Sequence, residues 1–507
     1  MSVFDLRWIQ FSLFLVAVTS YLFKRLRYAT ASRGLPLPPG PSGKPIIGSL
    51  LELAQHETAR ALARYREPYG DIVMFQGLGN KVLMLNSLQA INDLLDKRSS
   101  KYSHRPESVF GGELVGMHES MVFLSYGDEW RAHRRLAHAA LNPTQVKQYH
   151  TIQEDIATSL AKSLLDTPED FFSLVRMSAG RTVIAVTYGI PASSAQTEYI
   201  LTGESFLEIA GKATIPGNYL CDFISPLKYA PSWVPFQQEA AEGRKLMKEL
   251  LTKPFEHVKR DMDAGVALPS LTRNLLMSPP DDTSDFDRRL MWVAGSMFAA
   301  GAETTYATVL SFILAMALNP DKLKLAQAEI DAVIGNDRLP TIQDRGSLPY
   351  VEAVIKETMR WQPALPLSVA RRSAEDDFYR GYYIPKDTVV IPNVWALAYE
   401  PNSKYNPEAF LPERFLDPTQ SIVDPGAWAF GFGRRICPGR HMGENSVFIL
   451  IATLLAVFDI SAPTDAEIIP EFTQHLVRLP KPYKCRILPR SNAKVGVVET
   501  RAASTVV

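Results

Sequence analysis

Apolar residues recur along most of this chain with the spacing of helices. Residues 150–280 follow that pattern, with interruptions at Gly189-Ile190-Pro191 and around Pro216-Gly217. From Phe286 to Asn319 the chain is apolar on almost every face, and Pro320 ends the run. A helix of that length spans roughly 50 Å, and one that is apolar all round belongs in a core. The pattern therefore predicts a long central helix.

Shorter patterns predict a mainly α fold with small β-sheets. Helices are expected from Asp128 to Asn142 and from Gly443 to Phe458. Weak alternation with two glycines predicts two short strands and a turn between Val73 and Leu85. A strand is expected at Val389-Val390-Ile391, a hairpin from Phe472 to Ile487, and disorder in the polar tail of residues 491–507.

An apolar run from Trp8 to Phe23 precedes the basic residues Lys24, Arg25, Arg27 and Arg33. Its 16 residues would rise about 24 Å as a helix, and long basic side chains can make up the difference to a ~30 Å hydrocarbon core. A cleaved signal peptide is the alternative, but it would carry its positive charge before the apolar run. Residues 1–33 are predicted to be a single-pass membrane anchor that leaves the rest of the chain in the cytosol.

Composition limits the possible functions. The 507 residues include 54 basic and 54 acidic side chains, so the net charge of zero gives no sign of a nucleic-acid partner. The three cysteines, Cys221, Cys437 and Cys485, are too few for a disulfide framework and fit a reducing compartment. Length alone would allow about three domains.

The most distinctive chemistry lies in the ten residues from Phe430 to Gly439, which read Phe-Gly-Phe-Gly-Arg-Arg-Ile-Cys-Pro-Gly. The loop leads into a predicted helix, whose N-terminus favours negative charge, so the thiol of Cys437 is expected to ionise readily. One thiolate without a second soft ligand suits the axial position of a haem iron better than a zinc site. A buried structural cysteine and a two-ligand metal site with His441 are the alternatives.

The spacing of Phe430, Gly433, Arg435, Cys437 and Gly439 resembles the haem-binding loop of the cytochrome P450 family. The resemblance covers nearly the whole chain and implies one catalytic domain, residues 34–490. It implies haem b as the cofactor, with Cys437 as the axial ligand of the iron and Phe430, Gly433 and Gly439 in the surrounding loop. A thiolate ligand favours cleavage of the O–O bond of dioxygen.

Inside the long helix, Ala300-Gly301-Ala302-Glu303-Thr304-Thr305 matches the oxygen-activation sequence of the same family. An acid and two hydroxyls are costly in so apolar a helix unless they are paired or used. Thr304 can bond back to a preceding carbonyl and open the helix ladder to water, and an acid beside a hydroxyl can relay protons. Glu303 and Thr304 are therefore the predicted catalytic residues. A helix kink with satisfied polar groups is the alternative.

The haem propionates need hydrogen-bond donors, and the sequence offers an indole and three guanidinium groups. Trp130 and Arg134 share one face of the helix from Asp128 to Asn142, where an indole N–H and a guanidinium can hold a carboxylate. The resemblance adds Arg435 and Arg371. Many members of the family have Pro-His where this chain has Ala370-Arg371, which leaves Arg372 as the alternative to Arg371.

The other faces of that helix carry Arg131, His133 and Arg135. They form either a docking patch for an electron donor or a solvated basic face.

Two further groups of residues follow from the resemblance. Glu357 and Arg360 share a helix face and would join Arg414 in a buried, structural ion network. The loop from Arg98 to Met121 would cover a substrate pocket, although its apolar residues could equally be ordinary loop anchors. The pocket candidates are Phe110, Leu114, Met117, Phe298, Ala299, Leu365, Leu367 and Val477.

These features predict a haem-thiolate monooxygenase of the endoplasmic reticulum membrane with a cytosolic catalytic domain. It would insert one oxygen atom of O2 into a lipophilic, terpenoid-type molecule. The segments Ile384-Pro385-Lys386, Pro412-Glu413-Arg414-Phe415 and Leu227-Lys228-Tyr229 resemble those of fungal enzymes of natural-product metabolism, and this resemblance implies a role in fungal secondary metabolism. Its electrons would come from NADPH through a cytochrome P450 reductase. An isomerase or dehydratase on the same haem scaffold is one alternative. A non-enzymatic haem sensor is another, and it would need a second strong axial ligand.

Overall fold

The computed structural model describes residues 28–505 apart from residues 46, 55–56, 193–195, 216–217, 280–283 and 465, together with residues 15, 19 and 26. The predicted membrane anchor, residues 1–33, therefore lies largely outside the described residues, as does the break expected at Pro216-Gly217.

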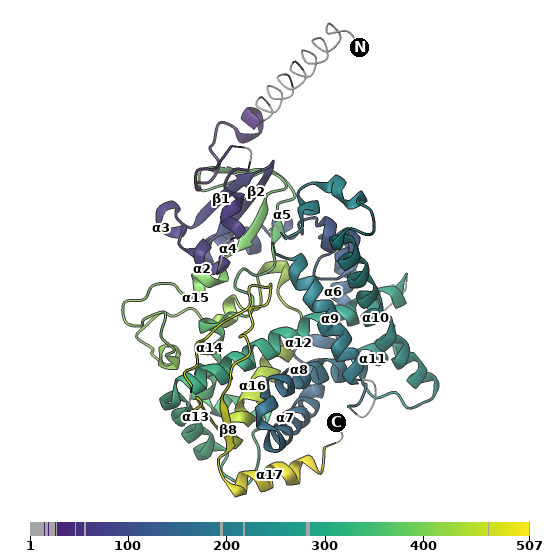
Figure 1. Cartoon of the computed structure of the whole chain (residues 1–507), viewed down its shortest axis with the longest axis vertical. Coiled ribbons are helices and arrows are strands. Elements are labelled where there is room, and N and C mark those ends of the chain that lie inside the picture. The colour runs from purple at the N-terminus through teal and green to yellow at the C-terminus, as the bar shows by residue number, and fades with distance from the viewer. Residues whose placement is uncertain are drawn as a thin grey trace.

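Helices dominate the described chain, and the strands β1 and β2 lie toward its N-terminal end, whereas β8 lies at the opposite end beside α7 and α17 (Figure 1). The longer helices are α6 (Asp128–Leu141), α7 (His150–Asp166), α8 (Phe171–Tyr188), α9 (Gln196–Ala213), α10 (Pro235–Asp263), α12 (Phe286–Leu318), α13 (Pro320–Val333), α14 (Pro349–Trp361) and α16 (Arg440–Val457). The shorter ones are α2 (Thr58–Ala63), α3 (Arg66–Tyr69), α4 (Leu88–Ile91), α5 (Ser99–Tyr102), α11 (Leu271–Met277), α15 (Val394–Ala398) and α17 (Asn492–Ala502). The mainly α fold with small sheets is as predicted.

The central helix is α12, which packs against α6, α8, α10, α14 and α16. Among the described residues it is the one helix long and apolar enough to cross a membrane, but 78% of its most apolar window is buried inside the protein. It is therefore the core helix that its all-round apolar pattern predicted. The helix is long enough to run along the cavity described below, and its residues form one wall of that cavity.

A four-stranded sheet has the order β1-β2-β6-β3. The strands β1 (Ile72–Gly77) and β2 (Asn80–Leu85) form the predicted antiparallel pair, and β6 (Val389–Pro392) runs parallel to β2. The two-residue strand β3 (Arg371–Arg372) pairs Arg371 with Val390 and Arg372 with Val389. Because neighbouring residues of a strand point to opposite faces, this pairing separates the two arginine side chains.

Two further sheets have two strands each, and the C-terminal part differs from the predicted hairpin. The strand β4 (Asp377–Tyr379) pairs with β5 (Tyr382–Ile384), and β7 (Phe458–Ser461) pairs with β8 (Arg486–Pro489). The predicted hairpin from Phe472 to Ile487 is reduced to a turn closed by one bridge between Phe472 and Pro480. Proline has no N–H to donate, so Pro480 and Pro482 stop the ladder there.

The predicted disorder of residues 491–507 is wrong for most of that stretch, because Asn492–Ala502 forms α17. Ser491 caps this helix by accepting a hydrogen bond from the N–H of Lys494. Val498 is fully buried, and the Lys494 ammonium donates to the carbonyl of Gly335 at 2.6 Å. Arg501 pairs with Asp155 of α7. The polar composition of the tail could not predict these contacts, because they depend on residues elsewhere in the chain.

Candidate active site

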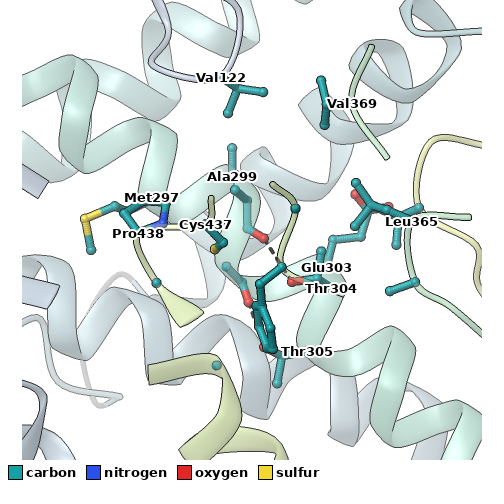
Figure 2. Close-up of a pocket in the computed structure, with 18 of the residues that line it drawn as sticks. Val122, Met297, Ala299, Glu303, Thr304, Thr305, Leu365, Val369, Cys437 and Pro438 are labelled. Carbon is teal, nitrogen blue, oxygen red and sulfur yellow. Dashed lines mark hydrogen bonds between the residues drawn. The ribbon is translucent and has the colours of Figure 1, made fainter. Parts of the chain in front are cut away.

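A cavity of about 740 Å³ lies between α12 and the loop before α16. Glu303, Thr304 and Thr305 line it from α12, and Cys437 reaches it from the loop (Figure 2). Val122, Leu365 and Val369 add apolar walls. The structure therefore brings the two most distinctive motifs of the sequence to one space.

Backbone geometry directs Cys437 toward this cavity. The N–H of Cys437 donates to the carbonyl of Phe430 at 2.8 Å and closes the loop. Gly433 has a φ of +51°, and a Cβ added there would lie 2.1 Å from the carbonyl oxygen of Leu95. Only glycine combines that φ with so close an approach, so Gly433 fixes the shape of the loop. The loop then enters α16 at Arg440.

The thiol of Cys437 is less readily ionised than its sequence context suggested. Its side chain has exposed surface toward the cavity, but the protein crowds the sulfur on its other sides. This desolvation raises the pKa of Cys437, and it outweighs the hydrogen bond from Gly439 and the charge of Arg134, which lower it. Coordination to a metal ion reverses the balance, because a coordinating thiol is deprotonated outright.

Three buried arginines beside the cavity have no carboxylate partner in the described chain. Arg105 and Arg435 donate only to main-chain carbonyls, at 2.5–3.2 Å. Arg371 donates one hydrogen bond to the carbonyl of Phe432 at 3.1 Å, and its Nε and Nη1 atoms have no partner. Buried arginines normally find anions, so this cluster requires one.

The electrostatics of the cluster support that conclusion. Burial lowers the pKa of Arg105 to about 9 and that of Arg435 to about 8. Burial and repulsion from Arg105 and Arg435 also lower the pKa of Arg371. The two carboxylates of haem would supply the missing negative charge, and the sulfur of Cys437 would supply the axial ligand. The donor set therefore fits haem. Sequence analysis missed Arg105, which lies in an irregular loop and belongs to no recognised motif.

The other predicted propionate contacts differ in their placement. Trp130 and Arg134 both line the cavity from α6, and Arg134 donates to the carbonyl of Ile436 at 2.6 Å. The guanidinium of Arg435 lies 4.5 Å from the ring centre of Trp130. Arg372 instead points away and pairs with Glu107 at 3.1 Å and Asp387 at 3.2 Å. The structure thus favours Arg371 over Arg372.

On α12 the threonines bond back to the helix. The Thr304 hydroxyl donates to the carbonyl of Ala300 at 3.2 Å, and that of Thr305 donates to Gly301 at 2.9 Å. The helix is nevertheless continuous from Phe286 to Leu318, so the expected opening of its ladder is not present. Gly301 allows α8 to approach closely, because an added Cβ would lie 3.0 Å from Val183.

Glu303 is the titratable group of this wall. Burial raises its pKa to about 7; the nearby Arg176 lowers it and Glu204 raises it. Arg176 of α8 and Glu204 of α9 form an ion pair at 3.0 Å, so Arg176 only partly compensates Glu303. An acid with a pKa near neutrality can both accept and release protons under working conditions.

The structure separates the predicted pocket residues into two groups. Met117, Ala299, Leu365 and Val477 line the cavity. Phe110, Leu114, Phe298 and Leu367 do not, since they pack elsewhere. The ring of Phe110, for example, stacks on Tyr219 with centres 3.4 Å apart. The lining that sequence analysis missed includes residues of α9 and α10, namely Phe206, Leu207, Ala210, Met247, Leu250 and Leu251.

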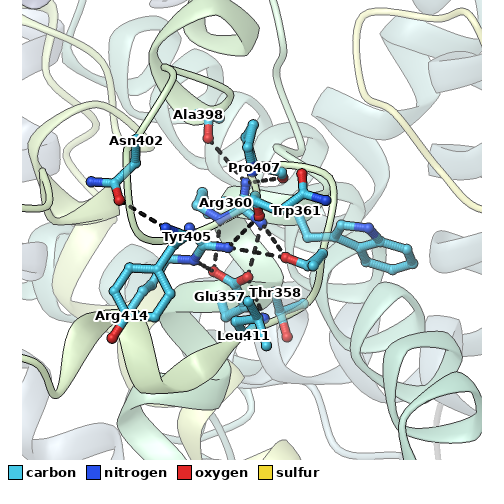
Figure 3. A network of polar contacts seen from close by, with 12 residues as sticks. Glu357, Thr358, Arg360, Trp361, Ala398, Asn402, Tyr405, Pro407, Leu411 and Arg414 are labelled. Atoms are coloured by element: carbon cyan, nitrogen blue, oxygen red, sulfur yellow. Dashed lines mark hydrogen bonds and ion pairs between the residues drawn. The ribbon is translucent and has the colours of Figure 1, made fainter.

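A buried ion network supports the site from α14 (Figure 3). Glu357 pairs with Arg360 at 2.7 Å and with Arg414 at 3.0 Å, and all three side chains are at most 5% exposed. Glu357 also accepts the N–H of Leu411 at 2.7 Å. The remaining donors of the two arginines bind main-chain carbonyls, including that of Ala409. The network ties α14 to residues 398–414, the segment that leads toward the Cys437 loop.

The basic residues on the other faces of α6 do not form one solvated face. His133 is fully buried, lies 3.3 Å from Glu129, and has a pKa lowered by burial. Arg131 pairs with Asp128 and lies over the ring of Tyr126 at 5.3 Å. The guanidinium of Arg434 lies 5.1 Å from the centre of the same ring. Arg131 and Arg434 thus form a basic surface next to the Cys437 loop.

A sulfur facing a cavity beside uncompensated buried cations defines a haem-thiolate site. Comparison with protein families agrees, because the Cytochrome P450 family model matches residues 38–487, and the chain belongs to this family. It is 38% identical over 493 residues to cytochrome P450 monooxygenase COX2 of Coprinopsis cinerea, covering 94% of this chain and 93% of the relative. It is 38% identical over 470 residues to cytochrome P450 monooxygenase claR of Ampulloclitocybe clavipes, covering 90% and 87%.

Membership of the family establishes the cofactor and the reaction class. The enzyme is a cytochrome P450 monooxygenase that uses haem b, O2 and electrons derived from NADPH. Enzymes of this family generally receive those electrons from a redox partner and act on lipophilic molecules. Haem supplies the activation of dioxygen. The chain supplies the sulfur, the cations and the proton-carrying side chains.

Proposed function

We propose that this enzyme hydroxylates a lipophilic, terpenoid-type small molecule in fungal secondary metabolism. The observation that carries the proposal is the placement of Cys437 and the Glu303–Thr304 pair around one largely apolar cavity. The fungal relatives support the setting. An apolar pocket with few polar groups binds its ligand by burial and fixes its orientation through those few groups.

In this proposal each site residue has a role. Cys437 binds the iron, and Arg105, Arg371, Arg435, Trp130 and Arg134 hold the propionates. Thr304 offers a hydroxyl at the cavity wall, and Glu303 supplies protons to it. The pKa of about 7 keeps Glu303 protonated in a substantial fraction of molecules at neutral pH. Glu357, Arg360 and Arg414 hold the scaffold and take no part in the reaction.

The redox partner proposed here is the NADPH-dependent cytochrome P450 reductase. Arg131 and Arg434 both lie against the ring of Tyr126, and Arg434 belongs to the loop that carries Cys437. A basic surface at that place favours an acidic partner and speeds its encounter. High salt should therefore slow electron transfer more than it slows substrate binding.

The proposed location is the endoplasmic reticulum membrane, with residues 1–33 as anchor. The apolar run from Trp8 to Phe23 followed by basic residues supports it. A second support is the surface segment before α10, where Tyr229 is 81% and Trp233 is 73% exposed. Large apolar side chains exposed together mark a contact surface, and tryptophan and tyrosine favour the membrane interface.

Replacement of the sulfur tests the proposal. The reduced, haem-loaded enzyme is expected to give the red-shifted carbon monoxide band of a thiolate ligand, and Cys437→Ala is expected to lose it together with turnover. Cys485→Ala is the matched control, because Cys485 lies outside the cavity lining. A thiolate band that persists in Cys437→Ala would refute the ligand assignment. Turnover that needs neither NADPH nor reductase would favour an isomerase or dehydratase.

A further inference from the structure

The polar side chain of His475 lies in a largely apolar part of the cavity, where the turn of residues 473–477 meets the end of α9. His475 lines the cavity from that turn, and Gly211 and Thr214 line it from the C-terminal end of α9. A Cβ added to Gly211 would lie 3.8 Å from the Cβ of His475. The absence of a side chain at position 211 leaves the space beside the imidazole open.

The backbone around His475 is firmly held. The N–H of Thr473 donates to the carbonyl of Leu479, and that of Arg478 donates to the carbonyl of Ala364, both at 2.8 Å. Glu57 accepts from Gln474 at 2.7 Å and pairs with Arg478 at 3.0 Å. These contacts lie on both sides of His475 and hold the backbone from which its ring projects.

The ring itself has no protein partner among the described residues, in contrast to its neighbours in the turn. The nearby hydroxyl of Thr214 donates to the carbonyl of Gly211 at 2.7 Å, which leaves its oxygen free to accept. The surrounding lining is apolar and includes Phe206, Leu207, Ala210 and Leu476. An imidazole on a held backbone, without a protein partner in the described chain and among such apolar surroundings, is suited to bind a ligand.

We propose that His475, assisted by Thr214, binds a hydrogen-bonding oxygen of the substrate. The enzyme then selects lipophilic molecules that already carry one hydroxyl or carbonyl group over the corresponding hydrocarbons. The inference rests on the proposed monooxygenase function, because it concerns the substrate of that same cavity. A molecule held at this end presents its apolar body to the rest of the cavity, so His475 is a specificity residue that also sets which carbon is oxidised.

Two probes that share a carbon skeleton, farnesol and β-farnesene, test the inference. Equilibrium dialysis with the haem-loaded full-length enzyme gives a Kd for each probe without depending on the iron. Farnesol is expected to bind at least about fivefold more tightly, which is the effect of one neutral hydrogen bond. His475→Phe is expected to raise the Kd of farnesol by about the same factor and to leave that of β-farnesene unchanged.

Two further variants sharpen the test. His475→Gln retains a donor and an acceptor, so part of the preference for farnesol should return. Gly211→Val keeps the imidazole but fills the space beside it, so the preference should fall. Equal affinity of the parent enzyme for both probes, failure of farnesol to bind, or a preference that survives in His475→Phe would overturn the inference.

The spectra separate this inference from the proposed function. All His475 and Gly211 variants should keep the thiolate band of the carbon monoxide complex, whereas its absence from the parent enzyme would refute the proposed function instead. A resting spectrum with a nitrogen ligand that disappears in His475→Phe would also overturn the inference, because the ring would then be bound to iron.

Discussion

Arg371 donates a single hydrogen bond, to the carbonyl of Phe432 at 3.1 Å, although it is 98% buried. Phe432 lies in the Cys437 loop, so this contact joins strand β3 to the segment that carries the sulfur. Two further donors of Arg371, Nε and Nη1, have no partner in the described chain and can bind an anion. A cation in this position lowers the stability of the haem-free chain and becomes favourable when haem carboxylates arrive.

Replacing Arg371 should therefore separate folding from haem binding. Arg371→Leu is expected to weaken haem binding about 10- to 100-fold, the range for charged hydrogen bonds, while the haem-free chain becomes no less stable. Haem content after gel filtration and urea unfolding of the haem-free protein measure the two effects. Arg372→Leu is the matched control and should change neither, because Arg372 pairs with Glu107 and Asp387 outside the cavity. Equal haem loss in both variants would contradict the assignment.

Thr304 is expected to govern how reducing equivalents are used. Thr304→Ala removes the hydroxyl at the cavity wall but keeps the helix, since alanine is the best helix former. The variant should bind haem normally and release more peroxide per NADPH consumed, with severalfold less product. Ser311→Ala, which removes a buried hydroxyl of α12 outside the cavity lining, is the control. Coupling equal to that of the parent enzyme in Thr304→Ala would argue against a role in proton delivery.

The raised pKa of Glu303 predicts a pH dependence of stability. In the unfolded chain a glutamate ionises near pH 4.5, whereas in the folded protein the pKa of Glu303 is about 7. The folded state binds more protons between these values, so its stability is full below about pH 4.5 and falls as pH rises through about 7. Glu303→Gln should remove this loss and be more stable than the parent at pH 8, by about 1–3 kcal/mol.

Urea unfolding at several pH values between 4.5 and 8 measures that difference. Glu408→Gln is the control, because Glu408 is an exposed acid that pairs with Arg60 at 2.9 Å, and it should show little change in the same pH range. If the difference in unfolding free energy between Glu303→Gln and the parent stays constant across the whole pH range, burial does not raise the pKa of the Glu303 carboxyl.

The buried network on α14 should be far more sensitive than a surface ion pair. Glu357→Gln leaves the guanidinium groups of Arg360 and Arg414 uncompensated in a site at most 5% exposed, which should cost about 3–5 kcal/mol of unfolding free energy. Removal of the exposed pair Arg60–Glu408 should cost less than about 1 kcal/mol. Similar losses in the two cases would show that the network is not a structural lock.

Local sequence determined much of this protein. The all-round apolar run of α12 predicted a core helix because no face of it could meet water. The spacing around Cys437 and the Glu303-Thr304 pair indicated the chemistry, because a thiolate loop and polar groups in an apolar helix are both costly without a use. The Glu357–Arg360 pair could be predicted because residues three apart share a helix face.

Tertiary structure alone decided the rest. Arg105 lies in a loop without periodic pattern, and only the packing of distant segments places it beside Arg371 and Arg435. Phe110 looked like a pocket residue but stacks on Tyr219, more than 100 positions away in the chain. The polar tail became α17 because Val498 and Lys494 find partners on other elements. Contacts between residues far apart in the chain leave no mark in local patterning, so neither the part of Arg105 in the anion site nor the position of His475 in the cavity could be read from the sequence by itself.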